Sequence, residues 1–333
     1  MSSKCRRGLT VIELIVVCAC VCAIAALTLT AVQAARESSR RMSCLNNLHN
    51  LGVGFADYLA CHKKFPDSIS TEEVVEGLYL SRKAVPGPVI LLARQISPNV
   101  NKFRHGLAKY GEMIGANPDF AKVYETDVGE ALLNCPSNAL IKGAITYRFC
   151  VGTTYLQGNR KRGLGGDYAK VDGAFGINIG RREMEISDGF SNTACMAERV
   201  PGAGVNGRGR VSGEVFRIDF PLRHSVEPEE WSRQCELSSR NSDFAGISEI
   251  PHGLSFWQIY YTHFLTPNSA LKDCWSRNSQ FDAAFAARSK HFGGACVMFL
   301  DGRSQLVSSG IERAIWHAVG CADDGIIDPF SSL

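Results

Sequence analysis

The hydrophobic pattern of the chain opens with a long apolar run. From Leu14 to Ala35 the sequence contains no charged residue, and a short basic leader precedes this run. At about 1.5 Å of rise per residue, the run predicts a helix of roughly 33 Å, long enough to cross the hydrocarbon core of a bilayer. Glu13 stands at its start, where a carboxylate costs on the order of 3 kcal/mol to insert. We therefore expect a partner for the charge of Glu13.

The pattern then changes to that of an amphipathic helix. Apolar residues recur at steps of three or four and form one stripe, made of Leu45, Leu48, Leu51, Phe55 and Leu59. No proline interrupts residues 9–65. The membrane span (9–35) and its continuation (36–62) are therefore predicted to form one helix of roughly 80 Å, weakened near its end by Gly52 and Gly54. The stripe predicts a helix face packed on a globular head, residues 63–333.

The head alternates between helical and strand-like patterns. Short helices are expected at 71–82, 88–95 and 103–114, with proline and glycine between them. Strands are expected at 145–152, 173–179, 193–199 and 211–218, and a last helix at 311–319.

The clearest strand pair lies at 295–307. Its centre, Asp301-Gly302, is a dipeptide preferred in type I′ hairpin turns, which need positive φ. The first arm, Cys296–Leu300, is apolar throughout and is predicted to be buried on both faces. Together these elements predict an α+β fold, with one long helix packed on an antiparallel β-sheet and extra short helices around it.

The charge balance argues against one class of partner. The sequence has 36 lysines and arginines against 33 aspartates and glutamates. Three of the basic residues, Lys4, Arg6 and Arg7, lie in the leader, so the chain without it carries equal numbers of each sign. A net charge near zero, with no basic patch interleaved with aromatic residues, predicts no binding of nucleic acid.

The leader and the start of the apolar run form a signal. The leader (residues 1–8) ends in Gly8, the apolar Leu9 follows, and Glu13 is the fifth residue after the glycine. This arrangement resembles the type IV prepilin signal, in which a membrane-embedded prepilin peptidase cuts after the glycine and N-methylates the new first residue. The resemblance implies cleavage after Gly8 and methylation of Leu9. It also makes Glu13 the charge partner of the Leu9 amine on a neighbouring subunit, a use of buried pairs that fixes register.

Three other interpretations of the N-terminus stay open, and none of them uses Glu13. Val32 and Ala34 precede Ala35 as small residues precede a secretory cleavage site. Val17–Cys20 loosely resembles a lipoprotein signal, and an uncleaved anchor is the third alternative. Basic residues flank both ends of the run, so charge does not orient it. The prepilin resemblance implies a single-pass protein of the bacterial inner (cytoplasmic) membrane, with the leader in the cytoplasm and the head in the periplasm.

Further motifs are spread over almost the whole chain. They are Ala31–Glu37, Arg40–Cys44, Asn46–Leu48, Phe65-Pro66, Cys135–Ser137, Ser187–Thr193, Glu198 and His291, which nine residues separate from Asp301-Gly302. In this order they resemble the large bacterial pilin-like family of unknown function that is defined by a C-terminal His, nine residues, Asp-Gly signature. Thr30 stands where that family commonly has proline, which predicts a straighter membrane helix. Residues 200–280 carry no motif of the family.

The chain has 13 cysteines. Cys18, Cys20 and Cys22 lie in the membrane span, where they act as small apolar residues, and Cys5 lies in the leader. The others are expected in a compartment that permits disulfides. Because Cys44 and Cys135 lie in family motifs, the resemblance implies that they form a disulfide between helix and head, worth about 4 kcal/mol on the chain-entropy model. Pairing of Cys235 with Cys274 is a further hypothesis, and Cys195 and Cys296 are expected as free thiols in core strands.

Candidate catalytic and ligand patterns each have a simpler structural explanation. His291 with Asp301 suits an acid–base pair or a metal site, but a histidine bracing the hairpin explains it as well, since Asp301 belongs to the turn. The glycines at 202–209 imitate a dinucleotide-binding loop without the helix that must follow. Asp188-Gly189 and residues 323–325 lack the spacing of a calcium-binding loop. The sequence also contains no C-x-x-C pair, the spacing that is typical of a structural zinc site. We therefore expect no enzyme, no cofactor and no metal.

These features predict a membrane-anchored type IV pilin-like or pseudopilin-type protein, a subunit of a pilus or a type II secretion pseudopilus. Its expected partners are prepilin peptidase, membrane lipid, and itself or other pilins through the N-terminal helix. The alternative is a monomeric bitopic protein whose extracytoplasmic head binds a ligand, which the large head and the 32 glycines of the chain favour.

Overall fold

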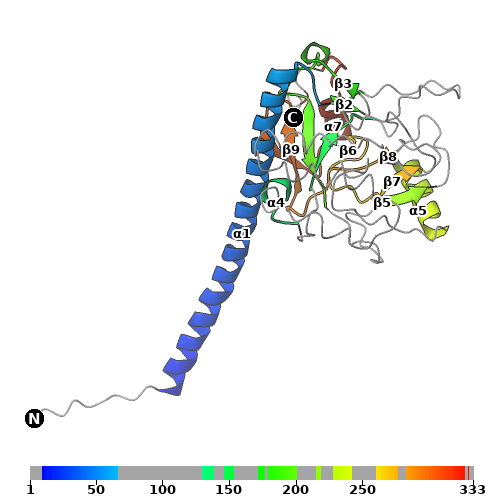
Figure 1. Cartoon of the computed structure of the whole chain (residues 1–333). Helices are drawn as coiled ribbons and strands as arrows, with labels where there is room; N and C mark the ends of the chain where they lie inside the picture. Colours follow the sequence, from blue (N-terminus) through cyan, green and yellow to red (C-terminus); the bar gives the residue numbers. More distant parts are fainter. Residues whose placement is uncertain are drawn as a thin grey trace, which may run out of the picture.

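The computed structural model describes residues 10–66, 130–138, 146–153, 172–176, 179–200, 215–218, 228–241, 260–276, 283–326 and 329. Its longest element is helix α1, Val11–His62, which is continuous over 52 residues. Figure 1 shows the second half of α1 lying along the head and the first half extending away from it. The uninterrupted helix predicted from the absence of proline is confirmed.

Local hydrogen bonds define where α1 begins and where it ends. Thr10 is the N-cap, and its hydroxyl accepts a hydrogen bond from the backbone N–H of Glu13, while the Glu13 carboxylate accepts one from the backbone N–H of Thr10. This reciprocal capping box satisfies two N–H groups that a helix start leaves unpaired. At the other end Lys63 adopts a left-handed conformation, and its N–H donates to the carbonyl of Leu59.

The head is built around a five-stranded sheet with the order β10-β9-β4-β1-β6. Its strands are β1 (Tyr147–Cys150), β4 (Ala194–Glu198), β6 (Tyr260–Tyr261), β9 (Gly294–Phe299) and β10 (Ser304–Ser308). Neighbours are antiparallel except β1 and β6, which run parallel. The predicted antiparallel sheet is therefore confirmed in its four larger strands, and the two-residue β6 makes it mixed.

Each face of this sheet is covered by a helix. On one face the stripe of α1 packs on Phe149, Met196 and Met298. On the other face Trp316 and Val319 of α7 (Arg313–Gly320) pack on Ala197, Val297 and Phe299. Successive residues of a strand point to opposite faces, so β9 contributes to both cores. Its prediction as a strand buried on both sides is confirmed.

A smaller lobe lies beyond the five-stranded sheet, on the side away from α1 (Figure 1). It contains β5 (Val215–Ile218), β7 (Asp273–Ser276), β8 (Ala283–Ala284) and helix α5 (Pro228–Asn241). Strands β5 and β7 run parallel, and β8 pairs antiparallel with β7. Asp273 joins the lobe to the sheet, because its buried carboxylate pairs with Arg288 at 2.8 Å and with Arg148 of β1 at 3.5 Å.

Four short elements complete the described part of the head. Helix α4 (Glu130–Leu133) precedes Cys135, β2 (Phe175–Gly176) pairs with β3 (Ile179–Gly180), and the short helix η3 covers Glu183–Glu185. The single strand predicted at 173–179 is therefore the β2–β3 pair. Helix α5 was not predicted, and the helices expected at 71–82, 88–95 and 103–114 and the glycine loop at 202–209 lie outside the described residues.

The hairpin of β9 and β10 confirms the predicted arms but corrects the predicted turn. Gly302 has a φ of 83°, whereas Asp301 is not among the described non-glycine residues with positive φ. Type I′ needs positive φ at both positions, so that prediction is wrong. Instead, the N–H of Gly302 donates to the carbonyl of Phe299, and the N–H of Phe299 donates to the carbonyl of Arg303. These bonds enclose three loop residues, Leu300 to Gly302, and three-residue loops commonly end in a left-handed glycine.

Candidate functional site

The first half of α1 is an uncovered apolar surface. Every residue from 10 to 36 is exposed, including Val11, Ile24 and Leu27, which are 73%, 63% and 73% exposed. Among the described helices, α1 is the one that is long and apolar enough to cross a membrane. Large apolar surfaces exposed on an isolated chain mark contact with a membrane or with other proteins. The first half of α1 is thus compatible with a single membrane span.

Glu13 has partners within its own chain. One carboxylate oxygen lies 2.8 Å from the backbone nitrogen of Thr10 and 2.9 Å from its hydroxyl. The partner that the sequence led us to expect for Glu13 is therefore Thr10 of the same chain, in the helix cap. This cap leaves the negative charge itself unneutralised.

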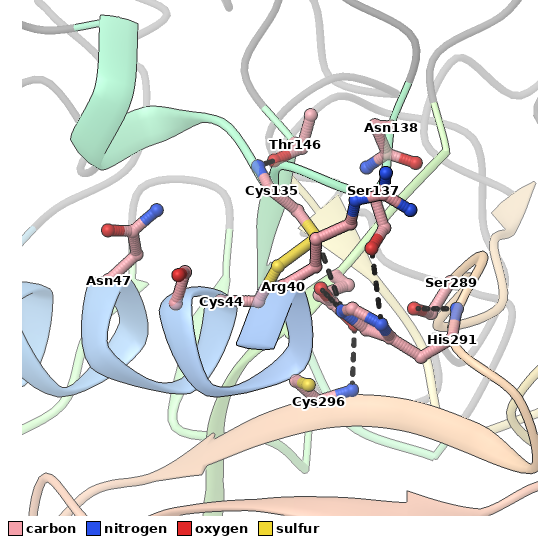
Figure 2. The surroundings of a disulfide bond; sticks show 12 residues. Arg40, Cys44, Asn47, Cys135, Ser137, Asn138, Thr146, Ser289, His291 and Cys296 are labelled. Atoms are coloured by element: carbon pink, nitrogen blue, oxygen red, sulfur yellow. Dashed lines mark hydrogen bonds and ion pairs between the residues drawn. A yellow bond between two sulfur atoms is a disulfide. The ribbon is translucent and has the colours of Figure 1, made fainter. Parts of the chain in front are cut away.

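The second half of α1 is fixed to the head by a disulfide, drawn in Figure 2. Cys44 of α1 is bonded to Cys135, across a Cα–Cα distance of 5.0 Å. The backbone nitrogen of Cys135 donates to Thr146 at 2.7 Å, and Asn47 donates to the carbonyl of Asn134 at 3.0 Å. Two cysteine pairs lie at disulfide distance as predicted, this one and Cys235–Cys274, which joins α5 to β7.

Beside this disulfide, His291 connects three parts of the chain. Its Nδ1 lies 2.5 Å from the carboxylate of Glu37 on α1, and its Nε2 lies 3.3 Å from that of Glu198 at the end of β4. Ser137 also donates to Glu37, at 3.3 Å. The second oxygen of Glu198 accepts a hydrogen bond from the backbone nitrogen of Cys296 on β9, at 2.9 Å. We call Glu37, Glu198 and His291 together with the Cys44–Cys135 bond the helix–head joint.

The charges of the joint shift its titrating groups. Burial alone lowers the pKa of His291, but the hydrogen bonds and negative charges of Glu198 and Glu37 outweigh burial and raise that pKa. Burial tends to raise the pKa of Glu37, but its hydrogen bond to His291 and the charge of that ring outweigh burial and lower it. Both shifts favour an imidazolium held between two carboxylates.

The Asp-Gly turn lies further along the same helix. Its Gly302 faces Gly52 of α1, where an added Cβ would lie 2.9 Å from the Gly302 Cα and 3.1 Å from the sulfur of Met298. The Ser187–Thr193 motif holds the turn from the other side. Backbone carbonyls of Phe190 and Thr193 accept from Asp301 and Leu300, and that of Ser191 accepts from the side chain of Arg303.

Residues 33–77 and 115–314 match the family described as "Protein of unknown function (DUF1559)". The chain belongs to the DUF1559 family. No curated protein and no solved structure matches it. The match includes all four parts of the joint as well as the Asp-Gly turn, so the contacts between helix and head lie within the DUF1559 region.

Within this DUF1559 chain, the predicted site residues fall into three places. Gly8 and Leu9 lie outside the described residues, and Glu13 lies at the exposed start of α1. Cys44, Cys135 and His291 meet at the joint, while Asp301 and Gly302 form the turn. His291 and Asp301 have different partners, because the Asp301 carboxylate accepts from the backbone of Arg303. His291 braces α1 against β4 rather than the hairpin itself, which corrects the sequence-based interpretation.

Two residues of the joint were given no role by the sequence analysis. Glu37 and Glu198 appeared there as motif members only. Glu198 is completely buried at the end of a core strand, and a carboxylate in that position is a signal for a charged partner. Asp188 was weighed as a calcium ligand, and its carboxylate instead accepts from the backbone nitrogens of Asp324 and Gly325 at 3.0 and 2.8 Å. Cys195 and Cys296 are buried free thiols, as predicted.

Proposed function

We propose that this DUF1559 protein is a membrane-anchored, pilin-like subunit that prepilin peptidase processes after Gly8 and N-methylates on Leu9. Its first helical half spans the inner membrane as a single pass, with the head in the periplasm, and packs against the same segment of other subunits or pilins. The observation that carries the proposal is the uncovered apolar surface of residues 11–35 on a helix whose other half is locked to the head. Its role is structural, in a pilus or a type II secretion pseudopilus, rather than catalytic.

The mass of the mature protein tests the processing step. We expect a chain that begins at Leu9, carries one additional methyl group, and lacks two hydrogens for each disulfide. Gly8→Val should leave the leader attached, because a protease that cuts after glycine must bring the backbone close at that residue. A chain that begins at residue 35, or one with a lipid on Cys20, contradicts the proposal.

The charge of Glu13 tests assembly. Glu13→Gln keeps a side chain that can cap the helix but removes the charge. If helices pack together, a buried Leu9 amine then loses its partner, which costs about 3–5 kcal/mol. Thr10→Ala is the matched control, because it removes a capping hydroxyl and leaves the charge in place.

The readout is disulfide crosslinking between subunits in cells. The parent for this experiment carries Val32→Cys, and its Cys18, Cys20, Cys22 and Cys61 are replaced by alanine. We expect dimers in the parent and in Thr10→Ala, and a loss of dimers in Glu13→Gln. Equal monomer patterns in the parent and in Glu13→Gln would mean that the helices do not pack together and that Glu13 only caps its own helix. In that case the alternative, a monomeric bitopic protein with a ligand-binding head, replaces the assembly proposal.

A further inference from the structure

The helix–head joint gathers four potential metal ligands from four separate segments. The Sγ atoms of Cys44 and Cys135, a carboxylate oxygen of Glu198 and a ring nitrogen of His291 all lie within 4.8 Å of one another. All four residues are buried. In a tetrahedral zinc site with bonds of about 2.0–2.3 Å, neighbouring ligand atoms are separated by roughly 3.3–3.8 Å. The joint therefore has the ligand types and the size of a four-coordinate site.

The histidine of this group is oriented as in a metal centre. Its Nδ1 is hydrogen-bonded to Glu37 at 2.5 Å, which directs Nε2 towards Cys135 Sγ and Glu198, each at 3.3 Å. Ligating histidines almost always donate their other ring N–H to a carboxylate or a carbonyl, which fixes the ring and its tautomer. Glu37 occupies that outer position and is itself bonded by Ser137. Figure 2 shows the His291 ring directed at the disulfide.

The carboxylate of Glu198 supplies an independent observation. The residue is completely buried. One oxygen accepts from the backbone of Cys296, whereas Oε1 accepts no hydrogen bond within the part of the chain that the structure describes. A buried carboxylate oxygen without a hydrogen bond is costly. This oxygen is ion-paired with His291 Nε2 at 3.3 Å and lies beside the disulfide, so a metal ion bound here would replace the imidazolium as its partner.

We propose that, when the Cys44–Cys135 disulfide is reduced, these two thiolates bind one Zn²⁺-class cation together with Glu198 and His291. The reductant is a separate dithiol molecule. It supplies two electrons and two protons, the Cys44–Cys135 bond breaks to give two thiols, and the reductant itself becomes a disulfide. Metal binding then displaces the thiol protons and the proton on Nε2. The sulfurs separate to about 3.8 Å, a spacing that the Cα–Cα distance of 5.0 Å accommodates. Helix and head thus stay joined in both redox states, by a disulfide in one and by a metal in the other.

This proposal differs from the sequence-based expectation that no metal binds. That expectation relied on spacing along the sequence, and no C-x-x-C pair is present. Here the ligands come from α1, the turn after α4, the end of β4 and the segment before β9. The inference does not depend on how the N-terminus is processed, so it can fail or succeed separately from the proposed function.

Cobalt binding to the full chain in detergent tests the site. Cys18, Cys20, Cys22 and Cys61 are replaced by alanine to remove the exposed thiols. After anaerobic reduction and removal of the dithiol, we expect one Co²⁺ per chain, with the thiolate charge-transfer and visible bands of tetrahedral cobalt. Zn²⁺ should abolish these bands, and the oxidised protein should not produce them. Absence of the bands in the reduced protein would overturn the proposal.

Variants separate the site from other thiols. His291→Gln and Glu198→Gln should weaken Co²⁺ binding at least tenfold, and Glu37→Gln, outside the ligand set, by about 10–100-fold. Cys235→Ser combined with Cys274→Ser is the matched control and should bind as the parent does. Equal binding in the parent and in His291→Gln would rule the site out.

A measurement on the parent alone guards against variants that fail to fold. Zn²⁺ should slow alkylation of Cys44 and Cys135 in the reduced protein, and should leave Cys235 and Cys274 unaffected. Peptide mapping assigns the rates. Unchanged alkylation of Cys44 and Cys135 would contradict the proposal.

Discussion

The two faces of the central sheet are covered by helices that are held in different ways. On the α1 face, the helix is held by a disulfide and by a histidine that lies between two carboxylates, near the end of β4. On the α7 face, His263 is stacked on Trp316 with ring centroids 3.6 Å apart, surrounded by apolar and aromatic side chains. Both helices also approach the sheet through a glycine, Gly52 on α1 and Gly320 on α7.

The two histidines show what this difference means. Carboxylates raise the pKa of His291, so it favours the charged form and links separate segments. Burial lowers the pKa of His263 to about 3, against a smaller opposing effect of its bond to the Trp316 carbonyl. The α7 face is a conventional core, whereas the α1 face carries charged and covalent links between the long helix and the head.

The largest effect is expected from the disulfide of the α1 face. Cys135→Ser should lower the free energy of unfolding by about 4 kcal/mol, because it releases a loop closed over a separation of 91 residues. It should also increase hydrogen exchange in residues 44–62 of α1. The control, Cys235→Ser combined with Cys274→Ser, should loosen α5 and leave α1 protected. Equal exchange of α1 in both variants would contradict a role specific to this face.

A smaller loss is expected from the glycine of the α7 face. In Gly320→Ala the new Cβ would lie 2.4 Å from Cγ of His263. That ring cannot move aside, since its nitrogens contact the Trp316 carbonyl at 2.5 Å and the Tyr261 hydroxyl at 3.0 Å. Overpacking should therefore cost about 2 kcal/mol in chemical denaturation.

Gly310→Ala is the matched control for Gly320→Ala. Its Cβ would lie 3.6 Å from the Ser308 hydroxyl, which is ordinary van der Waals contact. Its unfolding free energy should stay within about 0.5 kcal/mol of the parent. A similar loss in both variants would mean that the contact with His263 does not limit the α7 face.

The pH dependence of stability should come from the α7 face on the acid side. His263 is neutral in the folded protein and protonates near its ordinary pKa when unfolded, so the unfolded state binds more protons below about pH 6.5. Stability should be complete above that pH and fall by about 2 kcal/mol between pH 7 and pH 5. The groups that face His263 are Tyr261, Trp316 and His317.

Thermal unfolding at several pH values measures this loss. His263→Phe keeps an aromatic ring for the stack and should flatten the acid limb. His291→Gln, on the other face, should keep it. An acid limb of the same slope in His263→Phe would assign the effect to other groups.

Much of this arrangement could be predicted from the sequence, and particular residues show where prediction stopped. The steps of three and four from Leu45 to Leu59 predicted the buried stripe of α1, and the apolar run of Cys296–Leu300 predicted a strand in two cores. Strands β6 and β8 have two residues each, too few to show a period, so the parallel β1–β6 pair left no signal. Helix α5 was missed because polar residues dominate it, leaving Trp231, Cys235 and Leu237 as its apolar positions.

The joint was harder to predict for a different reason. Glu37, Glu198 and His291 are far apart in the sequence, and only the packing of α1 on the end of β4 brings them together. Family motifs identified the residues but not their contacts. The turn type was misjudged because Asp301-Gly302 was treated as a two-residue loop, whereas Leu300 belongs to the loop as well.

The position of the Cys44–Cys135 bond has a mechanical consequence. Cys44 is the first fully buried residue of α1 that the structure describes, so it lies at the point where the exposed first half of the helix gives way to the half that packs on the head. A pull on the exposed first half of α1 reaches this covalent bond before it reaches the apolar stripe beyond it. The bond transmits that pull to the head, so the stripe is not peeled away one turn at a time. The head can thus bear tension applied to the first half of α1 without losing the core beneath the second half.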